Sequence, residues 1–220
     1  MAEVALTVGP VKTAEEYAQR LKRIEGFVRR LHVDISDGVF TPAKTIDLAQ
    51  AYDVDDVPTD LHLMVSHPGQ LLEMVISFGP NLVICHEEAA ANWPELFGQW
   101  RELGIKVGLA LRADTPVAKI HDIIDQLDHV LVFTGDHIGF NHSHFQEGTL
   151  AKIAQIKAAN PKIEVGVDGG MSPEHTKQAV AAGADVINSG GYVVDAADPK
   201  AAYAEIVMAA SEVNDDDKTA

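Results

Sequence analysis

The sequence predicts an α/β protein with a single closed (β/α)8 TIM barrel, and three observations support this fold class. The length of 220 residues suits one large domain. Eight short runs rich in Val, Ile and Leu recur with little polar alternation, which is typical of parallel strands buried on both faces. Helix-start signals follow several of these runs, so strands and helices are expected to alternate about eight times. The runs are residues 4–8, 31–35, 60–65, 81–85, 106–111, 129–133, 163–167 and 185–188.

Capping residues mark where helices should begin and end between the expected strands. Thr13 with Glu16 fits a capping box before the first helix. Gly104 and Gly183 precede later strands and are expected to end helices there. A hydroxyl residue before a proline, an arrangement typical of a helix N-terminus, occurs at 66–68, 115–116 and 172–174.

We expect one barrel domain over residues 1–210, because no linker or change in composition divides the chain. An acidic, flexible C-terminal tail is expected over residues 211–220. An open doubly wound sheet is the alternative fold, but it usually carries a glycine-rich turn after its first strand, which Gly9-Pro10-Val11 does not provide. The long connection 135–148 after the sixth run is expected to be functional.

The composition excludes several classes of partner. A net charge of −16 argues against nucleic acid and against an anionic membrane surface, which both require basic patches. The single cysteine, Cys85, lies in an apolar run and is expected to be buried and inert. Neither a signal peptide nor an apolar run near the roughly 18 residues of a membrane span is recognisable, so we expect a cytoplasmic protein.

Four polar residues lie at the C-terminal ends of the expected strands, where barrels of this class place their active sites. They are His32 and Asp34, which share one strand face, with His62 and Asp168 on two other strands. Two imidazoles and two carboxylates suit one divalent metal such as Zn2+, Mn2+ or Fe2+. Taken singly, a histidine on a strand is more often a core residue, and an aspartate before Gly-Gly, such as Asp168, is more often a turn residue.

Several segments carry a family resemblance that runs from about residue 4 to residue 208. The stretches LHVDISDGVFTP at 31–42, DLHLMV at 60–65 and VDGG at 167–170 resemble signatures of the ribulose-phosphate 3-epimerase family. Residues 183–191 resemble that family's eighth strand and phosphate loop. The resemblance implies a TIM barrel of the ribulose-phosphate-binding type.

The same resemblance implies a reaction and roles for these residues. The family's metal ligands fall on His32, Asp34, His62 and Asp168, and its acid and base fall on Asp34 and Asp168. The implied activity is metal-dependent inversion at C3 of a ketose phosphate, D-ribulose 5-phosphate to D-xylulose 5-phosphate, through an enediolate. Two carboxyl groups on opposite sides of the substrate can exchange the C3 proton. A small phosphorylated sugar and further copies of this chain, as a homo-oligomer, are the implied partners.

Glycines after the last two expected strands predict a phosphate site, because loops at these positions commonly bind phosphate in such barrels. Gly169, Gly170, Gly190 and Gly191 would let backbone N–H groups approach the anion, although tight turns alone would also explain them. The resemblance adds three substrate contacts, Thr7, Met64 and Gly139.

The chain departs from the family pattern around the expected lid and apolar cap. Ser36 and Phe133 stand where the family usually has methionine, and Asn141 and His142 stand where its lid loop has glycine. We therefore expect retained metal-dependent proton transfer, on ribulose phosphate or on a different ketose phosphate. Five further side chains have two open interpretations, as extra contacts to the ligand or as solvated residues at the rim. They are His86, Arg112, His137, His142 and His144.

Two further functions stay open beside ribulose-phosphate epimerisation. A ketohexose 6-phosphate epimerase would use the same four ligands. A non-catalytic phosphosugar-binding barrel would keep the pocket without the reaction. A lyase of the orotidine-monophosphate-decarboxylase type is disfavoured, because its Asp-x-Lys-x-x-Asp motif would need lysine at Ser36.

Overall fold

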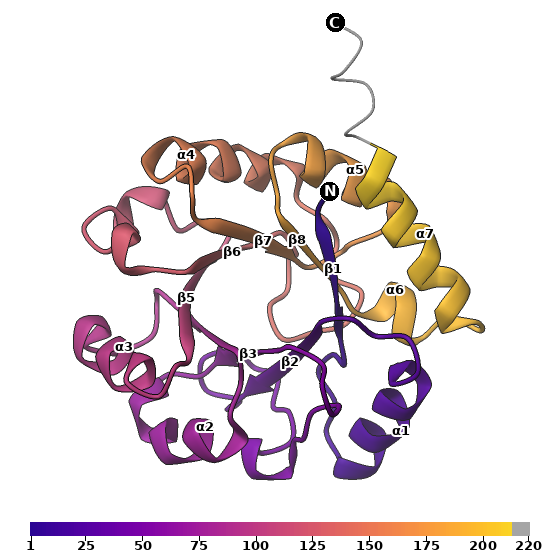
Figure 1. Ribbon diagram of the computed structural model, residues 1–220, viewed down its shortest axis with the longest axis horizontal. Coiled ribbons are helices and arrows are strands. Elements are labelled where there is room, and N and C mark those ends of the chain that lie inside the picture. Colours follow the sequence, from indigo (N-terminus) through magenta and orange to yellow (C-terminus); the bar gives the residue numbers. More distant parts are fainter. Residues whose placement is uncertain (213–220) are drawn as a thin grey trace, which may run out of the picture.

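The computed structural model describes residues 1–212 and confirms the predicted barrel. Eight parallel strands pair in sequence order, and β8 pairs with β1 to close the sheet (Figure 1). The strands are β1 (Glu3–Thr7), β2 (Leu31–Ser36), β3 (Thr59–Met64), β4 (Leu82–His86), β5 (Lys106–Leu111), β6 (His129–Phe133), β7 (Glu164–Asp168) and β8 (Val186–Ser189).

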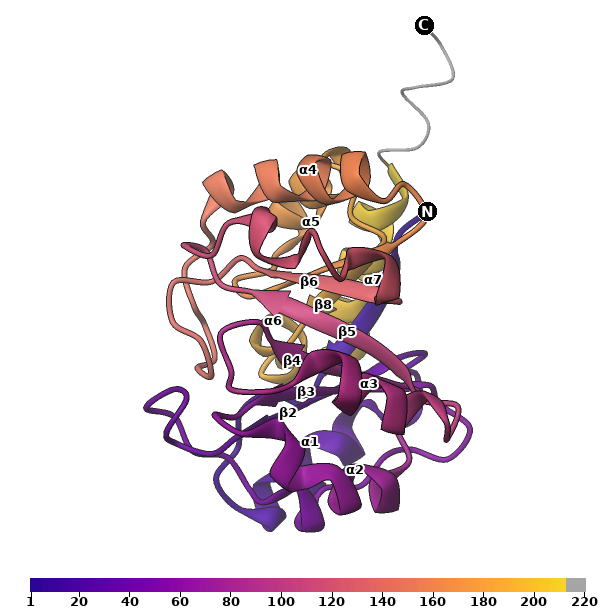
Figure 2. The ribbon, with the colours of Figure 1, turned by 90° about the vertical axis from the view of Figure 1, so that its left-hand side faces the viewer.

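Helices surround the barrel, with α4 and α5 on one side of the strands and α1 and α2 on the other (Figure 2). Ser172 caps α5 as predicted and accepts a hydrogen bond from the His175 N–H at 3.3 Å. Thr13 likewise caps α1 and accepts from Glu16 N–H at 3.2 Å. The α-helices are α1 (Ala14–Ile24), α2 (Leu72–Phe78), α3 (Trp93–Arg101), α4 (Ala151–Ala159), α5 (Pro173–Ala181), α6 (Gly191–Val194) and α7 (Pro199–Glu212).

The expected alternation of strand and helix is wrong in two connections. Between β2 and β3 the described helical structure is one 310 turn, η1 (Leu48–Gln50). Between β5 and β6 the predicted helix after Thr115 is replaced by η3 (Val117–Ile120) and η4 (Ile124–Gln126). The apolar side chains of η3 are nevertheless buried, because a 310 turn presents residues three apart on one face. The remaining 310 turns are η2 (Pro68–Leu71), which leads into α2, and η5 (Glu147–Leu150), which leads into α4.

The core fills both the barrel and the layer between strands and helices. Every residue of β3, β4 and β6 is buried, as expected for strands covered on both faces. Cys85 lies in this core, as predicted, and burial holds the pKa of its thiol above the ordinary range. The predicted tail begins inside α7, and its residues 213–220 lie outside the described part of the chain.

An ion network closes the N-terminal end of the barrel around Arg30. Its guanidinium contacts Asp60 at 2.7 Å, Glu164 at 2.8 Å and Glu3 at 2.8 Å. Burial opposes the charge of Arg30, but Glu164 and Asp60 outweigh it and raise the pKa of the guanidinium. Glu164 also accepts a hydrogen bond from Nδ1 of His129 at 2.7 Å. This end of such barrels serves stability, which leaves the opposite end for function.

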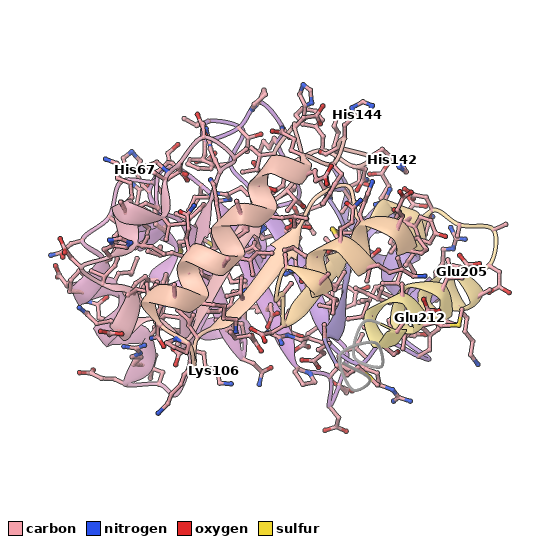
Figure 3. All side chains as sticks on the ribbon, turned by 90° about the horizontal axis from the view of Figure 1, so that it is seen from above. His67, Lys106, His142, His144, Glu205 and Glu212 are labelled. Carbon is pink, nitrogen blue, oxygen red and sulfur yellow. The ribbon has the colours of Figure 1, made fainter. Side chains whose placement is uncertain are left out.

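The two ends of the barrel are distinguished in Figure 3. Lys106, the first residue of β5, lies at one end, and His67, His142 and His144 lie at the other. The histidines belong to loops that follow strands, so their end is the C-terminal face. Within residues 1–212, no helix combines the length and apolar character needed to cross a membrane.

Candidate metal centre and active site

Four side chains converge at the C-terminal mouth of the barrel, and they are the four predicted from the sequence. One ligand atom from each of His32, Asp34, His62 and Asp168 lies within 4.8 Å of the others. His32 and Asp34 share the inward face of β2, because successive strand side chains alternate between faces. Asp34 and His62 are register partners on β2 and β3, which brings their side chains together.

The contacts within this cluster centre on Asp34. Its Oδ1 lies 3.0 Å from Nδ1 of His62 and 3.3 Å from Nε2 of His32. Nδ1 of His62 also lies 3.9 Å from Oδ2 of Asp168. Both imidazoles are fully buried, so bulk water cannot satisfy their nitrogens.

This donor set fits a divalent metal. Neither ring nitrogen of the completely buried His32 makes a hydrogen bond with the described residues, because the 3.3 Å contact of its Nε2 with Asp34 does not have hydrogen-bond geometry. An unpaired buried polar group is costly, so a bound cation would relieve an existing deficit. Two nitrogens and two carboxylates match the preferences of Zn2+, Mn2+ and Fe2+.

The two carboxyl groups differ in their pKa. Burial, followed by the charge of Asp34, raises the pKa of Asp168 from 3.8 to about 6. Burial also opposes ionisation of Asp34, but contacts with His32 and His62 outweigh it and hold the pKa of Asp34 well below its ordinary value. Environments that separate the pKa values of two neighbouring carboxyls are typical of acid and base pairs.

A pocket of about 290 Å3 opens over the cluster. Asp34 and Asp168 line its floor, whereas His32 and His62 lie beneath its surface. All seven residues predicted to contact substrate line the same pocket: Thr7, Met64, Gly139, Gly169, Gly170, Gly190 and Gly191. Their contact with substrate stays a prediction.

The glycines after β7 are required by packing. Gly169 has φ +108°, and a Cβ there would lie 2.4 Å from the backbone nitrogen of Gly135. Gly170 has φ +71°, and its Cβ would lie 2.7 Å from the backbone of Ser143 and of Phe145. Both positions therefore need glycine so that the β7 loop can pack against the loop after β6.

The long loop after β6 is held by one contact within the loop and one with Thr41, and it lines part of the pocket. An isolated bridge pairs Gly135 with Phe145, and the hydroxyl of Thr41 donates to the carbonyl of Ile138 at 2.9 Å. Its residues Gly139 to Ser143 line the pocket. The loop therefore closes one side of the site without a regular helix or strand.

Of the three loop histidines, only His142 lies at the pocket. Its Nε2 lies 3.1 Å from Oδ2 of Asp195, and its ring packs where a Cβ of Gly191 would be. His137 and His144 instead pair with Asp136, and their side chains are 71% and 90% exposed. Asp195 is itself paired with Arg20 at 3.1 Å, so His142 is tethered to α1 through one carboxylate.

The apolar wall of the pocket is only partly the one expected. Met64 and Phe133 line the pocket. Ser36 does not, because its hydroxyl turns away and donates to the carbonyl of Ala43 at 2.6 Å. Met171 also lines the pocket. It was not predicted from the sequence. Its position directly after the glycine pair 169–170 was the available signal.

Asn188 is a second pocket residue that the sequence reasoning missed. Its Nδ2 donates to the carbonyl of Val167 at 3.1 Å, which fixes the amide. Its Oδ1 has no hydrogen-bond partner among the described residues, and the residue is 1% exposed. The hydroxyl of Thr7 is likewise buried and unpaired within residues 1–212. A polar residue inside the apolar run of β8 was the signal that could have found Asn188.

Two other rim candidates have structural contacts. Arg112 lies 4.2 Å from the centroid of the Phe40 ring and donates to the Phe40 carbonyl at 2.9 Å. It is absent from the pocket lining. His86 is fully buried behind His62, with 2.9 Å between their Nε2 atoms.

Comparison with known proteins identifies the family to which the chain is similar. The model of the ribulose-phosphate 3 epimerase family matches residues 6–194. Ribulose-phosphate 3-epimerase of Bacillus subtilis is 32% identical over 184 residues, which cover 80% of this chain and 84% of the relative. The Schizosaccharomyces pombe protein of the same name is 31% identical over 207 residues, which cover 90% of each chain.

Solved structures support the fold alone. KGPDC from Streptococcus mutans superposes with a TM-score of 0.71 at 10% identity, covering 97% of this chain and 99% of the other. A 3-hexulose-6-phosphate synthase superposes with a TM-score of 0.69 at 17% identity, covering 94% and 99%.

Proposed function

The chain belongs to the ribulose-phosphate 3-epimerase family of isomerases, and on that basis we propose that it inverts C3 of D-ribulose 5-phosphate to give D-xylulose 5-phosphate. One observation carries the proposal: four potential metal ligands converge within 4.8 Å, and the two carboxylates among them line the floor of a pocket. Inversion next to a carbonyl needs such a pair of proton carriers.

Asp34 and Asp168 reach the substrate from β2 and β7, which are separated in the barrel by β1 and β8. In one direction Asp34, as carboxylate, removes the C3 proton, and the electron pair moves onto the C2 oxygen to form an enediolate. Asp168, as carboxylic acid, then returns a proton to the opposite face of C3. The reverse reaction exchanges the two roles, as microscopic reversibility requires.

His32, Asp34, His62 and Asp168 would hold one divalent metal, Zn2+, Mn2+ or Fe2+. When bound, the metal supplies a Lewis acid that stabilises negative charge developing on the substrate oxygens. The buried apolar wall of Met64, Phe133 and Met171 keeps water from the reacting carbon.

The remaining pocket residues are assigned to binding. Gly170, Gly190 and Gly191 offer backbone N–H groups to the phosphate, and the ring of His142 beside Gly191 adds a further donor when it is protonated. Thr7 and Asn188 present oxygen atoms, unpaired among the described residues, for hydrogen bonds with sugar hydroxyls. Local donors matter here because the chain as a whole carries a net charge of −16.

A coupled assay on D-ribulose 5-phosphate, with the protein loaded in turn with each metal, tests the proposal. Asp168→Asn should lower kcat by about 10²- to 10⁴-fold, because it removes one proton carrier. A metal-loaded wild-type protein that exchanges no C3 proton of any ketose phosphate with solvent deuterium would leave a non-catalytic phosphosugar-binding barrel.

A ketohexose 6-phosphate is the second candidate substrate. Two polar groups in the pocket wall favour this larger substrate, because each offers an additional contact. They are the amide oxygen of Asn188, which is unpaired within the described chain, and the ring of His142, which lies over Gly191. Parallel assays on a ketohexose 6-phosphate and on D-ribulose 5-phosphate separate the two, and the larger kcat/KM identifies the substrate.

We also propose a cytoplasmic location and a homo-oligomeric state. One relative, from rice, is named a cytoplasmic isoform, and one from Arabidopsis thaliana is named chloroplastic. The single buried thiol of Cys85 is compatible with a reducing compartment. Analytical ultracentrifugation of the purified chain tests the oligomeric state.

A further inference from the structure

A chain of hydrogen bonds leads from the candidate metal ligands into the protein through three residues, His62, His86 and Glu88, which we call the histidine relay. Nε2 of His62 lies 2.9 Å from Nε2 of His86. Nδ1 of His86 lies 3.2 Å from Oε2 of Glu88. Both imidazoles are fully buried, so each ring nitrogen depends on these protein contacts.

The surroundings of Glu88 decide which atoms of the relay carry protons. Its Oε1 accepts a hydrogen bond from the backbone N–H of Arg112 at 3.0 Å and another from the hydroxyl of Thr115. A carboxylate that accepts from these donors is an acceptor toward His86 as well. Nδ1 of His86 must therefore carry the proton, and in a neutral ring Nε2 is left as an acceptor.

The tautomer of His86 in turn determines which nitrogen of His62 carries a proton. Because Nε2 of His86 is an acceptor, Nε2 of His62 must carry a proton and donate it. In a neutral His62, Nδ1 then keeps its lone pair. That lone pair faces Oδ1 of Asp34 at 3.0 Å, so two acceptors oppose each other unless a proton or a metal ion bridges them.

We propose that His86 and Glu88 are positioning residues that fix the tautomer and orientation of His62, so that its Nδ1 is presented to a divalent metal. The inference rests on the proposed function for the presence of the metal. Residues that hold the second nitrogen of a metal-binding histidine commonly orient the ring and raise its basicity. The histidine relay differs from this common arrangement, because the buried His86 lies between the proposed ligand His62 and the carboxylate of Glu88.

Packing holds the middle of the relay in place. The ring of Phe40 packs on His86 with 4.9 Å between centroids, and the guanidinium of Arg112 lies over the Phe40 ring at 4.2 Å. Nζ of Lys152 donates to the carbonyls of Arg112 and Thr115, which anchors the segment that holds Glu88. His86 therefore has little freedom to turn away from His62.

Two variants interrupt the histidine relay without replacing a proposed metal ligand. His86→Phe keeps a ring of similar size but removes both hydrogen bonds. Glu88→Gln is nearly isosteric, and its amide N–H can donate to Nδ1 of His86, which would reverse the proton order along the relay. Glu87→Gln is the matched control, because it makes the same change of charge one residue away and outside the relay.

The first measurement is the Kd of the metal-free protein for Zn2+, by competition with a chromogenic chelator. Loss of such a contact typically weakens metal binding by about 10- to 100-fold. His86→Phe and Glu88→Gln should each raise the Kd by that factor, and Glu87→Gln should stay within about twofold of wild type. Histidine 15N spectra of the wild-type protein should show the proton of His86 on Nδ1.

A Zn2+ affinity of wild-type strength in both relay variants, or a His86 proton on Nε2, would overturn the inference. Wild-type protein that takes up no metal overturns it as well. Wild-type protein that binds Zn2+ more tightly than both variants but epimerises no ketose phosphate supports the relay and defeats the proposed function instead.

Discussion

Asp34 and His62 are register partners on neighbouring strands, and 3.0 Å separates Oδ1 of the first from Nδ1 of the second. The pairing follows directly from parallel strand geometry, since residues in register point to the same side of the sheet. The carboxylate of Asp34 and the fully buried imidazole of His62 thus meet inside the barrel, at the floor of the pocket. Polar side chains at the mouth of the barrel and at its opposite end lead to four testable predictions.

The amide oxygen of Asn188 is expected to accept a hydrogen bond from a substrate hydroxyl. Asn188→Leu should lower kcat/KM by about 10-fold or more, because a lost hydrogen bond of this kind costs roughly 1–3 kcal/mol. Steady-state kinetics on D-ribulose 5-phosphate measure the effect. Ile187→Val is the control on the same strand, on the opposite face, and should change kcat/KM by less than about twofold. Equal kinetics for both variants would remove Asn188 from the substrate site.

His142 is expected to bind the substrate phosphate. His142→Ala should raise KM several-fold and leave kcat nearly unchanged, because the phosphate is remote from the reacting carbon. His144→Ala is the matched control, since its side chain is 90% exposed and pairs with Asp136 outside the pocket. A KM that is the same in both variants would show that His142 only tethers the loop to Asp195.

Arg30 is expected to stabilise the barrel from the end opposite the site. Arg30→Met leaves Asp60 buried without its partner, which should cost about 3 kcal/mol or more of the free energy of unfolding. Urea unfolding measures this cost, and kcat of the folded enzyme should not change. Arg29→Met, at the exposed neighbouring position, should cost less than about 1 kcal/mol. A wild-type midpoint for Arg30→Met would contradict the prediction.

Glu164 is expected to make the stability of the protein depend on acid pH. Burial opposes its charge, but His129 and Arg30 outweigh it and lower the pKa of Glu164 from its ordinary value of 4.5. A depressed pKa gives stability that is present above that ordinary value and is lost as the pH falls below it. In Glu164→Gln, the free energy of unfolding should therefore fall less between about pH 5 and pH 2 than in wild type. Parallel pH profiles would count against this role.

The predicted strands agree with the structure to within about one residue, and the reason is visible in particular segments. The run 106–111 is β5 and the run 129–133 is β6. Strands covered on both faces must be apolar almost throughout, so they stand out from the polar loops around them. The cluster of His32, Asp34, His62 and Asp168 was predictable for the same reason, since polar residues at the ends of such runs point to the mouth.

Other features could not be predicted because they depend on contacts between distant segments. The segment after Thr115 has helix-start signals, yet it forms 310 turns, since short helices are marginal by themselves and packing decides their form. Ser36 stands where the family's apolar cap has a methionine. Its hydroxyl donates to the carbonyl of Ala43 and therefore points away from the pocket. Local sequence carries no record of either contact.

The sequence by itself determined the class of fold, the order of the strands and the four residues at the mouth, because burial on both faces of a strand constrains residue type locally. Only the tertiary structure decided how those residues act together. It aligned His62 with His86 and Glu88 across neighbouring segments, left the amide oxygen of Asn188 without a partner in the described chain, and turned His142 toward the pocket and His144 away. These relationships join residues far apart in the chain, and hydrogen bonding and desolvation between them exist only once the barrel has closed.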